Sequence, residues 1–484
     1  MSALKLCVLS SEILPYAKTG GLADVAGALI QNLRALGHEV HAFMPLYSAV
    51  RAAHPALRPV GGFPQLLTVG DQYRFSLLTA TYPGSDVAVY FVDCPALFDR
   101  PGFYTSDPDE HRRFILFTRA TLESCRYLGL APDIFHCNDW HTAFLPLYLQ
   151  TVYSTDPLLA RARSVLTIHN VGYQGVMPSA ALGDLGISGA AARLDADDLL
   201  HGVINPLKTG IKYADVVTTV SPTYAREISE GPLGMGMQAA LRARPNPVVG
   251  ILNGVDYQDW DPRHDPHLTA HFTPQDLRGK RTNKERLISA MGLDIAVSRP
   301  LIGMVTRLAE QKGIDLLFDV LPAMLQQYDF GVLVLGNGDP QYVAFFEGLA
   351  RRFPRRVAFR SGYDEFLAHL IEAGCDMFLM PSRYEPCGLN QMYSLRYGTI
   401  PIVRNTGGLA DSVRHFDPAT GIGTGCMFND YDPPAVRWAV TTTLTWYGVA
   451  NIWQRLMQNA MAEDFSWTRQ ILEYDSLYRA LLAV

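Results

Sequence analysis

Short apolar runs alternate with helix-length segments along the chain, and this alternation predicts its architecture. In the first half, runs typical of buried strands cover residues 4–10, 39–44, 87–92, 134–137, 165–168 and 216–220. Residues 22–36 carry leucine, valine and alanine at helical spacing, and residues 112–128 and 143–153 are also of helix length. Strands that alternate with helices in this way are typical of a doubly wound parallel sheet.

The pattern breaks at residues 242–247, Arg-Ala-Arg-Pro-Asn-Pro, which we interpret as a linker. A second alternation follows, with strands expected at residues 301–305, 332–335, 357–359, 377–380 and 400–403. We therefore expect an α/β protein with two Rossmann-like domains, residues 1–247 and 248–462, that face a central cleft. Residues 463–484 are expected to form a C-terminal amphipathic helix, which could pack on either domain.

The composition limits the classes of function. Of 484 residues, 48% are hydrophobic and 18% charged, which suits large buried cores, and the formal net charge of −6 argues against a general nucleic-acid binder. The seven cysteines form no Cys-x-x-Cys pair, so we interpret them as reduced thiols of a cytoplasmic protein without a zinc site. No stretch is typical of a signal peptide, and no apolar run approaches the ~18 residues of a membrane span, so we expect no membrane contact.

A carboxylate at the end of one predicted strand suggests the chemistry. After the apolar run 377–380 the chain turns at Pro386 and Gly388, and a helix follows that Gly398 ends. Glu385 is thereby held in the turn, directly before the free N–H groups of a helix. Helix N-termini attract phosphate, and open α/β sheets bind ligands at the carboxyl edge of their strands. The stretch therefore predicts an anion pocket with an acid beside it.

A glycine turn occurs twice. Lys18-Thr-Gly-Gly-Leu-Ala-Asp-Val25 is repeated as Asn405-Thr-Gly-Gly-Leu-Ala-Asp-Ser412, and both copies follow a strand and open a helix. Paired glycines let a ligand approach the backbone, although the repeat could also reflect only a shared tight turn. The first copy alone offers a lysine.

Polar side chains follow several other predicted strands. On the doubly wound model these side chains meet in the cleft. Together they suit a nucleoside diphosphate that carries a polar group, with cations accepting charge from the departing diphosphate. The set comprises Asp139 in the stretch 136–141, His169, Arg307, Lys312, the turn 336–339, Tyr363 and Glu385.

Bacterial glycogen synthases, whose family includes the plant starch synthases, carry similar motifs in the same order from near residue 8 to near residue 480. The chain resembles them at Lys18–Leu22, Asn138–His141, residues 169–175, 221–227, 251–256, 362–365, 382–391 and 465–467, and at Arg307 with Lys312. The resemblance implies a GT-B glycosyltransferase that moves glucose from ADP-glucose to the non-reducing end of an α-1,4-glucan such as glycogen, with retention at the anomeric carbon. It also implies that the C-terminal helix packs back on the N-terminal domain.

The resemblance also assigns roles to residues. As catalytic residues it implies Glu385, which would face the glucosyl group, with His169 and Asp139 holding sugar hydroxyls. Donor-binding residues would be Lys18, Gly20, Gly21, Arg307, Lys312, Tyr363, Gly388, Leu389 and Asn390, with Tyr363 stacking on the base. Candidate acceptor contacts are Glu12, Tyr104 and Asn253. We expect no cofactor and no metal, because three cations and helix N-termini can neutralise a diphosphate.

Three positions depart from the family pattern. Asn390 stands where some relatives have threonine, Asn405 stands where many have arginine, and Asn337 varies a Gly-x-Gly-Asp turn. Each keeps a polar side chain or leaves the backbone donors in place. We therefore expect the departures to affect donor affinity rather than reaction type.

Simpler interpretations compete at several positions. His169 alone would be typical of a buried core histidine, and Glu385 could cap the following helix. The acidic stretch 195–198 mimics a metal-binding Asp-x-Asp, but we interpret it as a solvated helix face. The histidines of the stretch 136–141 match no zinc spacing, and Trp140 is expected to pack rather than to contact the acceptor.

Other functions also remain open. A UDP-glucose-dependent transferase would use the same fold, and stacking on Tyr363 serves either base. A sugar-nucleotide hydrolase or epimerase would need no acceptor, so it would release nucleotide without glucan. A non-catalytic sensor would not need Glu385, His169 and Asp139 together. A pyridoxal-phosphate-dependent phosphorylase is disfavoured because no lysine has the sequence context of a cofactor lysine.

Overall fold

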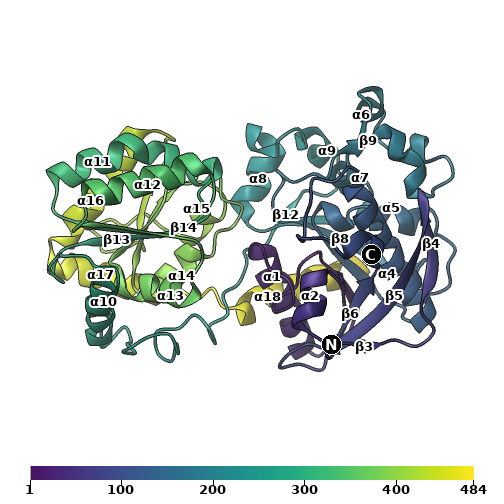
Figure 1. The fold of residues 1–484 in the computed structure, drawn as a ribbon, viewed down its shortest axis with the longest axis horizontal. Coiled ribbons are helices and arrows are strands. Elements are labelled where there is room, and N and C mark those ends of the chain that lie inside the picture. The colour runs from purple at the N-terminus through teal and green to yellow at the C-terminus, as the bar shows by residue number, and fades with distance from the viewer. Residues whose placement is uncertain (1, 484) are drawn as a thin grey trace. The chain divides into compact units, whose positions relative to one another are not determined.

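The computed structural model describes residues 2–483 and contains two compact units (Figure 1). Unit 1 consists of Met1–Val220, Ala225–Ile251 and Trp467–Val484, and unit 2 consists of Ser221–Tyr224 and Leu252–Ser466. The chain therefore passes from unit 1 into unit 2 near residue 251 and returns to unit 1 for its last helix.

Unit 1 is built on a ten-stranded sheet in the order β12-β11-β8-β7-β1-β2-β6-β5-β3, with β4 paired to β5. The strands are β1 (Lys5–Leu9), β2 (Glu39–Pro45), β3 (Arg58–Pro59), β4 (Gln65–Val69), β5 (Asp71–Thr81), β6 (Ala88–Asp93), β7 (Ile134–Asn138), β8 (Arg163–Ile168), β11 (Val216–Thr219) and β12 (Val249–Gly250). All strands from β12 to β6 in this order run parallel, whereas β3, β4 and β5 pair antiparallel. A small separate sheet joins β9 (Met177–Pro178) to β10 (Val203–Ile204).

The parallel strands of unit 1 confirm the predicted doubly wound sheet, and the antiparallel edge was missed. Strand β5 belongs to this edge, and of its residues only Phe75 and Leu77 are buried, so it has no continuous apolar run. A single glycine, Gly70, separates it from β4. The signal for this hairpin is period-two alternation on both sides of a Gly-Asp step, a weaker pattern than that of the buried parallel strands.

The helices of unit 1 lie between these strands in the sequence, except α18, which follows unit 2. They are α1 (Gly21–Ala35), α2 (Ser48–Ala53), α3 (Pro95–Phe98), α4 (Glu110–Leu128), α5 (Leu145–Gln150), α6 (Ala196–Leu200), α7 (Pro206–Tyr213), α8 (Pro222–Glu230), α9 (Gln238–Arg242) and α18 (Trp467–Leu482). Short 3₁₀ turns are η1 (Trp140–Thr142), η2 (Ser179–Leu185), η3 (Ala190–Arg193) and η4 (Pro232–Gly234). The segment expected to be helical over residues 143–153 contains only the short α5.

The C-terminal helix α18 packs within unit 1 against α1 (Figure 1). Two buried histidines contact it, His38 from the turn between α1 and β2 and His136 from the sheet. His38 Nε2 lies 3.0 Å from Asp475 Oδ1, and the ring of His136, in β7, lies 2.5 Å from the Tyr478 hydroxyl. Burial lowers the pKa of His136 to about 3, so this contact is between neutral groups.

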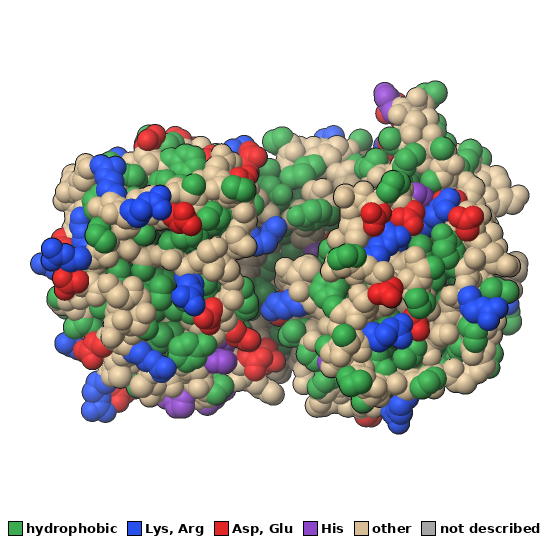
Figure 2. All heavy atoms as spheres, in the orientation of Figure 1, with side chains coloured by type: hydrophobic (Ala, Val, Ile, Leu, Met, Phe, Trp, Pro, Cys, Tyr) green, Lys and Arg blue, Asp and Glu red, His purple; other side chains and the backbone are tan. Residues whose placement is uncertain are grey.

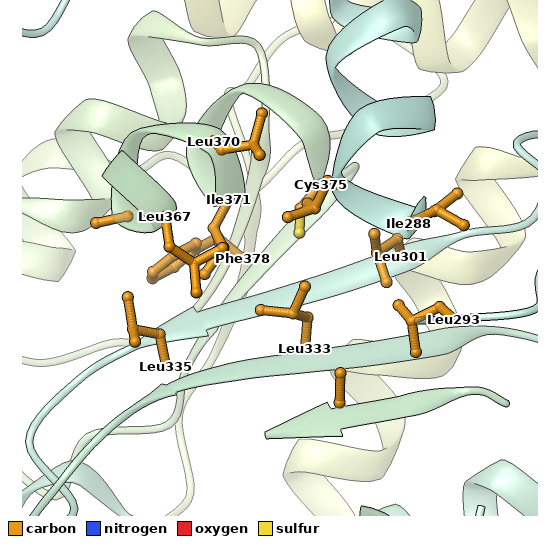
Figure 3. Close-up of a cluster of buried hydrophobic side chains, with 13 residues drawn as sticks. Ile288, Leu293, Leu301, Leu333, Leu335, Leu367, Leu370, Ile371, Cys375 and Phe378 are labelled. Carbon is orange, nitrogen blue, oxygen red and sulfur yellow. The ribbon is translucent and has the colours of Figure 1, made fainter. Parts of the chain in front are cut away.

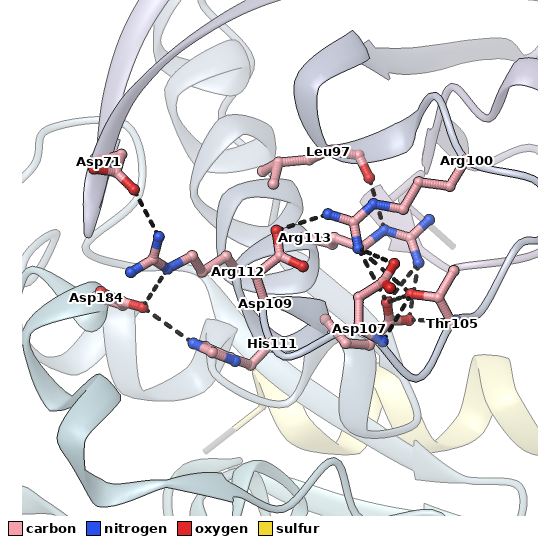
Figure 4. A network of polar contacts seen from close by, with 11 residues as sticks. Asp71, Leu97, Arg100, Thr105, Asp107, Asp109, His111, Arg112, Arg113 and Asp184 are labelled. Atoms are coloured by element: carbon pink, nitrogen blue, oxygen red, sulfur yellow. Dashed lines mark hydrogen bonds and ion pairs between the residues drawn. The ribbon is translucent and has the colours of Figure 1, made fainter.

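A polar network fixes the segment before α4 (Figure 4). The guanidinium of Arg100 lies 2.8 Å from Asp107 and 2.7 Å from Asp109, and the fully buried Arg113 donates to the Leu97 carbonyl at 2.8 Å. Arg113 also pairs with Glu110 at 2.8 Å, which compensates its buried charge, and the network as a whole orders the loop that carries Tyr104.

Unit 2 contains a six-stranded, fully parallel sheet in the order β15-β14-β13-β16-β17-β18. The strands are β13 (Leu301–Val305), β14 (Gly331–Gly336), β15 (Val357–Ser361), β16 (Met377–Met380), β17 (Ile400–Arg404) and β18 (Cys426–Phe428). This is the 3-2-1-4-5-6 order of a Rossmann sheet, whose direction of winding switches between its first and fourth strands. All five strands predicted in this half are present, and only the short β18 was not expected.

Helices cover this sheet, and leucine and isoleucine side chains fill the space beneath them (Figure 3). Leu301 and Leu333 from the sheet meet Ile371 from α13, Cys375 directly after α13, and Leu287 from α10. The helices are α10 (Arg278–Ala290), α11 (Leu317–Gln327), α12 (Pro340–Arg352), α13 (Glu365–Gly374), α14 (Asn390–Arg396), α15 (Gly407–Ser412), α16 (Pro433–Tyr447) and α17 (Ala450–Met461), with 3₁₀ turns η5 (Glu310–Lys312) and η6 (Ile314–Leu316).

On the face drawn in Figure 2, basic and acidic side chains are interspersed and do not gather into a patch of one sign. Among residues 2–483, no helix combines the length and the hydropathy needed to cross a membrane.

Candidate active site

The switch point of the unit 2 sheet carries a partly buried ion pair. Lys312 ends the 3₁₀ turn after β13, and Glu385 follows β16, so the two residues come from the strands where the winding reverses. Lys312 Nζ lies 2.6 Å from Glu385 Oε2, and the Ser382 hydroxyl donates to the same oxygen at 3.0 Å. Glu385 is only 5% exposed. We call Lys312, Ser382 and Glu385 the unit 2 cluster.

The second glycine turn, residues 405–412, contacts the backbone of Glu385. The Gly408 N–H donates to the Glu385 carbonyl at 3.0 Å and to the Pro386 carbonyl at 3.2 Å. Gly407 has φ +44°, and a Cβ at this position would lie 1.9 Å from the Glu385 carbonyl oxygen. The backbones therefore touch, and only glycine fits. In unit 2 the repeated motif thus braces the turn that presents Glu385.

The other cation predicted beside Glu385 is more exposed. Arg307 follows β13 and donates to Gln311 Oε1 at 3.2 Å, while Gln311 Nε2 donates to the Tyr384 carbonyl at 3.4 Å. Gln311 thus links Arg307 to the residue before Glu385. Tyr363 follows β15 and is 68% exposed, so its ring is accessible to a planar ligand.

The turn before α14 is fixed mainly by its own side chains. Asn390 Nδ2 donates to the Val305 carbonyl at 2.6 Å, which joins the start of α14 to the end of β13. Gln391 Nε2 donates to the carbonyls of Cys387 and Gly388 at 3.1 and 3.0 Å. The Asn390 side chain therefore holds the switch point together, a role that the sequence did not predict.

In unit 1, Asp139 and His169 follow the adjacent strands β7 and β8 and are in direct contact. The His169 N–H donates to Asp139 Oδ1 at 2.7 Å. Asp139 is 7% exposed and has φ +56°, an unusual backbone conformation for a residue other than glycine. Strained backbone conformations persist where the surroundings over-determine them and are frequent at active sites.

Burial controls the charge of both residues. It raises the pKa of Asp139 to about 7, although the N–H groups of His169 and Asn170 act in the opposite direction. It lowers the pKa of His169 to about 3. Asn138 Nδ2 donates to the Leu9 carbonyl at 2.9 Å, which turns its Oδ1 toward His169 Nε2 at 2.8 Å. His169 is therefore neutral, with its proton on Nε2 and a lone pair on Nδ1. We call Asn138, Asp139 and His169 the unit 1 cluster.

The first glycine turn is held by Glu12. The Thr19 N–H and hydroxyl both donate to the Glu12 carboxylate, the hydroxyl at 2.6 Å, and the Tyr104 hydroxyl donates to it at 2.6 Å. Glu12 therefore fixes the loop beside Lys18, and its carboxylate is already engaged within the protein. Lys18 itself is 43% exposed and pairs with Asp24 at 2.7 Å.

The third residue predicted to contact the acceptor, Asn253, lies in unit 2. It is 5% exposed, and its side-chain oxygen accepts no hydrogen bond from residues 2–483. A buried polar oxygen without a partner is costly unless a ligand or water satisfies it.

The acidic stretch 195–198 is accounted for without a metal. Asp195 accepts a hydrogen bond from the Asp198 N–H as the N-cap of α6, and Lys208 Nζ lies 3.0 Å from Asp195 and 2.8 Å from Asp198. Within the described residues, one set of three side chains could hold a metal ion: Asp265, His267 and His369 in unit 2. His369 Nδ1 and the Tyr397 hydroxyl both bind Asp265 Oδ2, at 2.8 and 2.5 Å. This carboxylate oxygen therefore already has two hydrogen-bond partners.

Sequence reasoning missed the residues that position these groups. Ser382, Asn138, Thr19 and Gln311 each contact a predicted site residue. Three of them lie within a few residues of their partners, and they could have been proposed as polar neighbours of a functional residue. Asn138 binds a residue 31 positions away, which only the pairing of β7 with β8 reveals.

Two protein families match the chain, one in each half. Residues 5–243 match the starch synthase catalytic domain family, and residues 292–453 match glycosyl transferases group 1. The chain is 46% identical to a glycogen synthase of Anaeromyxobacter dehalogenans over 99% of its own length and 100% of the relative's. It is 41% identical to a glycogen synthase of Thermotoga maritima, with 99% of each chain covered.

A solved structure is similar throughout. The catalytic domain of starch synthase IV from Arabidopsis thaliana, bound to ADP and acarbose, superposes with a TM-score of 0.90 at 35% identity and covers 100% of both chains. A sucrose-phosphate synthase from Thermosynechococcus elongatus, at 19% identity and a TM-score of 0.61, shares the fold.

Proposed function

The chain belongs to the family of glycogen and starch synthases and is a GT-B glycosyltransferase of glycogen synthesis, and from this membership we propose that its donor is ADP-glucose. The glucosyl group is transferred to the non-reducing end of an α-1,4-glucan with retention at the anomeric carbon. The observation that carries the proposal is the pair formed by Lys312 and Glu385 at the switch point of the unit 2 sheet.

The charge and shape of each side chain assign it to one part of the donor. In unit 2, Lys312 and Arg307 are the cations that would bind the diphosphate, and the exposed ring of Tyr363 would stack on the base. The nucleotide and the oligosaccharide in the Arabidopsis structure support a site for both kinds of substrate. A diphosphate that binds Lys312 competes with Glu385 for it, so donor binding would direct the carboxylate toward the glucosyl group.

The reaction then breaks the bond between the anomeric carbon and the diphosphate oxygen. Negative charge collects on the diphosphate, where the unit 2 cations stabilise it, while positive charge develops at the anomeric carbon. The acceptor 4-hydroxyl oxygen forms the new bond to this carbon, and its proton passes to the departing diphosphate, which leaves as ADP. Glu385 and Asp139 would stabilise the positive charge or hold the sugar hydroxyls, and the neutral His169 would accept or donate a hydrogen bond to them.

The experiment that tests the donor is an initial-rate comparison of ADP-glucose with UDP-glucose on a glycogen primer. We expect a higher kcat/KM with ADP-glucose and nucleotide release that depends on glucan. A preference for UDP-glucose would overturn the donor assignment but keep the reaction. Nucleotide release at the same rate without glucan would identify a hydrolase instead.

We expect the activity to survive exhaustive chelation. Lys312, Arg307 and Lys18 can neutralise a diphosphate without a divalent ion, as cations and backbone donors do at other phosphate sites. The measurement is the initial rate after dialysis against EDTA, with and without added Mg²⁺. A strict requirement for Mg²⁺ or Mn²⁺ would contradict the proposed role of these side chains.

We also expect Lys18→Gln to lower kcat/KM for the donor by about 10- to 150-fold, because a hydrogen bond to a charged group is worth ~1.5–3 kcal/mol. Its exposed pair with Asp24 contributes little to folding, so the melting temperature should hardly change. Lys5→Gln, at an exposed lysine of the same unit, is the matched control. Equal kinetics for the two variants would remove Lys18 from the donor site.

A further inference from the structure

Unit 2 brings two histidines and a carboxylate together outside the unit 2 cluster. Asp265, His267 and His369 each offer one ligand atom, and these atoms lie within 4.8 Å of one another. The side chain of Asp265 is fully buried and that of His369 is 2% exposed, while His267 is partly exposed. The set therefore has a buried floor and a side that faces solvent at His267.

The segment that carries Asp265 and His267 is rich in histidine. His264, His267 and His271 all lie within eleven residues, 261–271, although the whole chain of 484 residues has only 13 histidines. Figure 2 shows histidine side chains, drawn in purple, gathered at the lower edge of unit 2. Short tracts rich in histidine are typical of metal binding.

Ring contacts hold the two histidines of the set in place. Trp260 stacks on His369 with the ring centroids 3.7 Å apart, and Tyr393 stacks on Trp260 at 3.9 Å. The rings of His267 and His369 lie 4.5 Å apart at an interplanar angle of 42°. Side chains that are already ordered lose little entropy when they bind an ion, so this packing favours affinity.

The carboxylate of Asp265 orients the set and has room for an ion. Its Oδ2 accepts hydrogen bonds from His369 Nδ1 at 2.8 Å and from the Tyr397 hydroxyl at 2.5 Å, and its Oδ1 accepts from the His267 N–H at 2.8 Å. Two ligand atoms on one zinc ion lie about 3–3.4 Å apart, close to the separation of His369 Nδ1 from Asp265 Oδ2. An ion between these two atoms takes the place of the proton on His369 Nδ1, which passes to water. The bonds from Tyr397 and the His267 N–H remain.

The ligand types select the metal. Imidazole nitrogen suits borderline metals such as Zn²⁺, whereas Mg²⁺ and Ca²⁺ prefer shells of oxygen ligands. Two histidines and one carboxylate are also the three protein ligands of a common type of zinc site, in which water takes the fourth position. The solvent-facing side of the set at His267 admits this water.

The fold gives such an ion a structural task. In the described structure, residues 251–277 form neither helix nor strand between β12 and α10, and a stretch of this length without either is uncommon in a compact domain. Asp265 and His267 lie in this stretch, and His369 lies in α13. An ion bound to all three links positions that are about 100 residues apart, and links that close long loops restrict the unfolded chain most.

We propose that Asp265, His267 and His369 form a zinc site that fastens residues 251–277 to α13 and stabilises unit 2. The inference goes beyond the proposed function and does not depend on it. The ion acts on folding and not on glucosyl transfer, so it is compatible with an activity that survives chelation.

The test is a titration of Zn²⁺ into the full chain after treatment with EDTA and dialysis. Calorimetry should show a single high-affinity ion for each chain, and Zn²⁺ at about 100 times its dissociation constant should raise the melting temperature by about 3–5 °C. His267→Ala removes a partly exposed ligand, so the protein should stay folded and bind Zn²⁺ at least about 10-fold more weakly. His369→Gln should weaken binding as well.

His264→Ala is the matched control, because His264 is 51% exposed in the same segment and is not one of the three ligands. It should bind Zn²⁺ like the wild type, and Mg²⁺ should not compete. The visible absorption of Co²⁺ gives a second readout: the wild type should show the spectrum of a four-coordinate ion, and His267→Ala should not. If the wild type binds no Zn²⁺, or if His267→Ala binds it as tightly as the wild type, the site assignment is wrong. Equal losses in His264→Ala and His267→Ala would identify adventitious binding to surface histidines and also overturn it.

Discussion

Glu385→Gln should lower kcat by at least about 100-fold and leave the donor KM within a few-fold of the wild type. The substitution keeps the size of the side chain and an oxygen that can accept from Lys312 and Ser382, but it removes the negative charge. That charge acts most strongly when positive charge develops at the anomeric carbon, so its loss affects the transition state more than the bound donor. Steady-state kinetics with ADP-glucose and glycogen measure both parameters.

Two further variants test whether the loss of activity is specific to the charge and the position of Glu385. Glu385→Asp retains the charge but moves it by one methylene, and it should also lose activity if position matters as much as charge. Glu372→Gln is the control: Glu372 is a buried acid of the same unit whose pKa burial raises to about 8, so glutamine resembles its neutral form. Thermal unfolding checks that all variants are folded. Near-normal turnover of a folded Glu385→Gln enzyme would exclude Glu385 from catalysis.

The sheets could be predicted because their parallel strands are buried on both faces. Strands such as β14, in which every residue is buried, read as continuous apolar runs, and the intervening helices carry a 3.6-residue period. The strand order could not be read in the same way. The switch points follow from which strands pair, and pairing depends on contacts between residues distant in the sequence.

The candidate site was predictable where function requires an unusual local sequence. The turn around Glu385 and the two Thr-Gly-Gly motifs are recognisable because tight turns and close backbone approach restrict the residue types that fit. The structure places Lys312 in contact with Glu385, and His169 in contact with Asp139.

Contacts that are distant in sequence were not predictable. Glu12 was predicted as an acceptor contact, and the sequence did not show that its carboxylate binds Thr19 and Tyr104, the latter 92 residues away. The packing of Gly175 against the Trp140 ring likewise depends on two strands being neighbours. Such pairs leave no local pattern, because either partner alone is compatible with many environments.

The second large effect on turnover is expected at Asp139 of the unit 1 cluster. Asp139→Asn should lower kcat by about 100-fold, because the carboxylate can no longer carry negative charge beside the reacting sugar. Since burial raises the pKa of Asp139 to about 7, the wild-type rate should rise as pH increases through neutrality and the carboxyl group ionises. Asparagine does not titrate, so the variant should lack this rise. A pH–rate profile from pH 5.5 to 8.5 distinguishes the two enzymes.

The same pKa predicts an opposite effect on stability. The carboxyl group titrates near 3.9 when unfolded and near 7 when folded, so between these values the folded state binds more protons. The free energy of unfolding should therefore fall as pH rises from about 4 to 7 and level off above 7. Asp139→Asn removes this loss, so its stability relative to the wild type should increase from pH 5 to pH 8 by on the order of 1–3 kcal/mol. Denaturant unfolding at several pH values measures the difference. Parallel stability curves for the two proteins would show that Asp139 is ionised at an ordinary pKa, and the wild-type pH–rate profile would then need another titrating group.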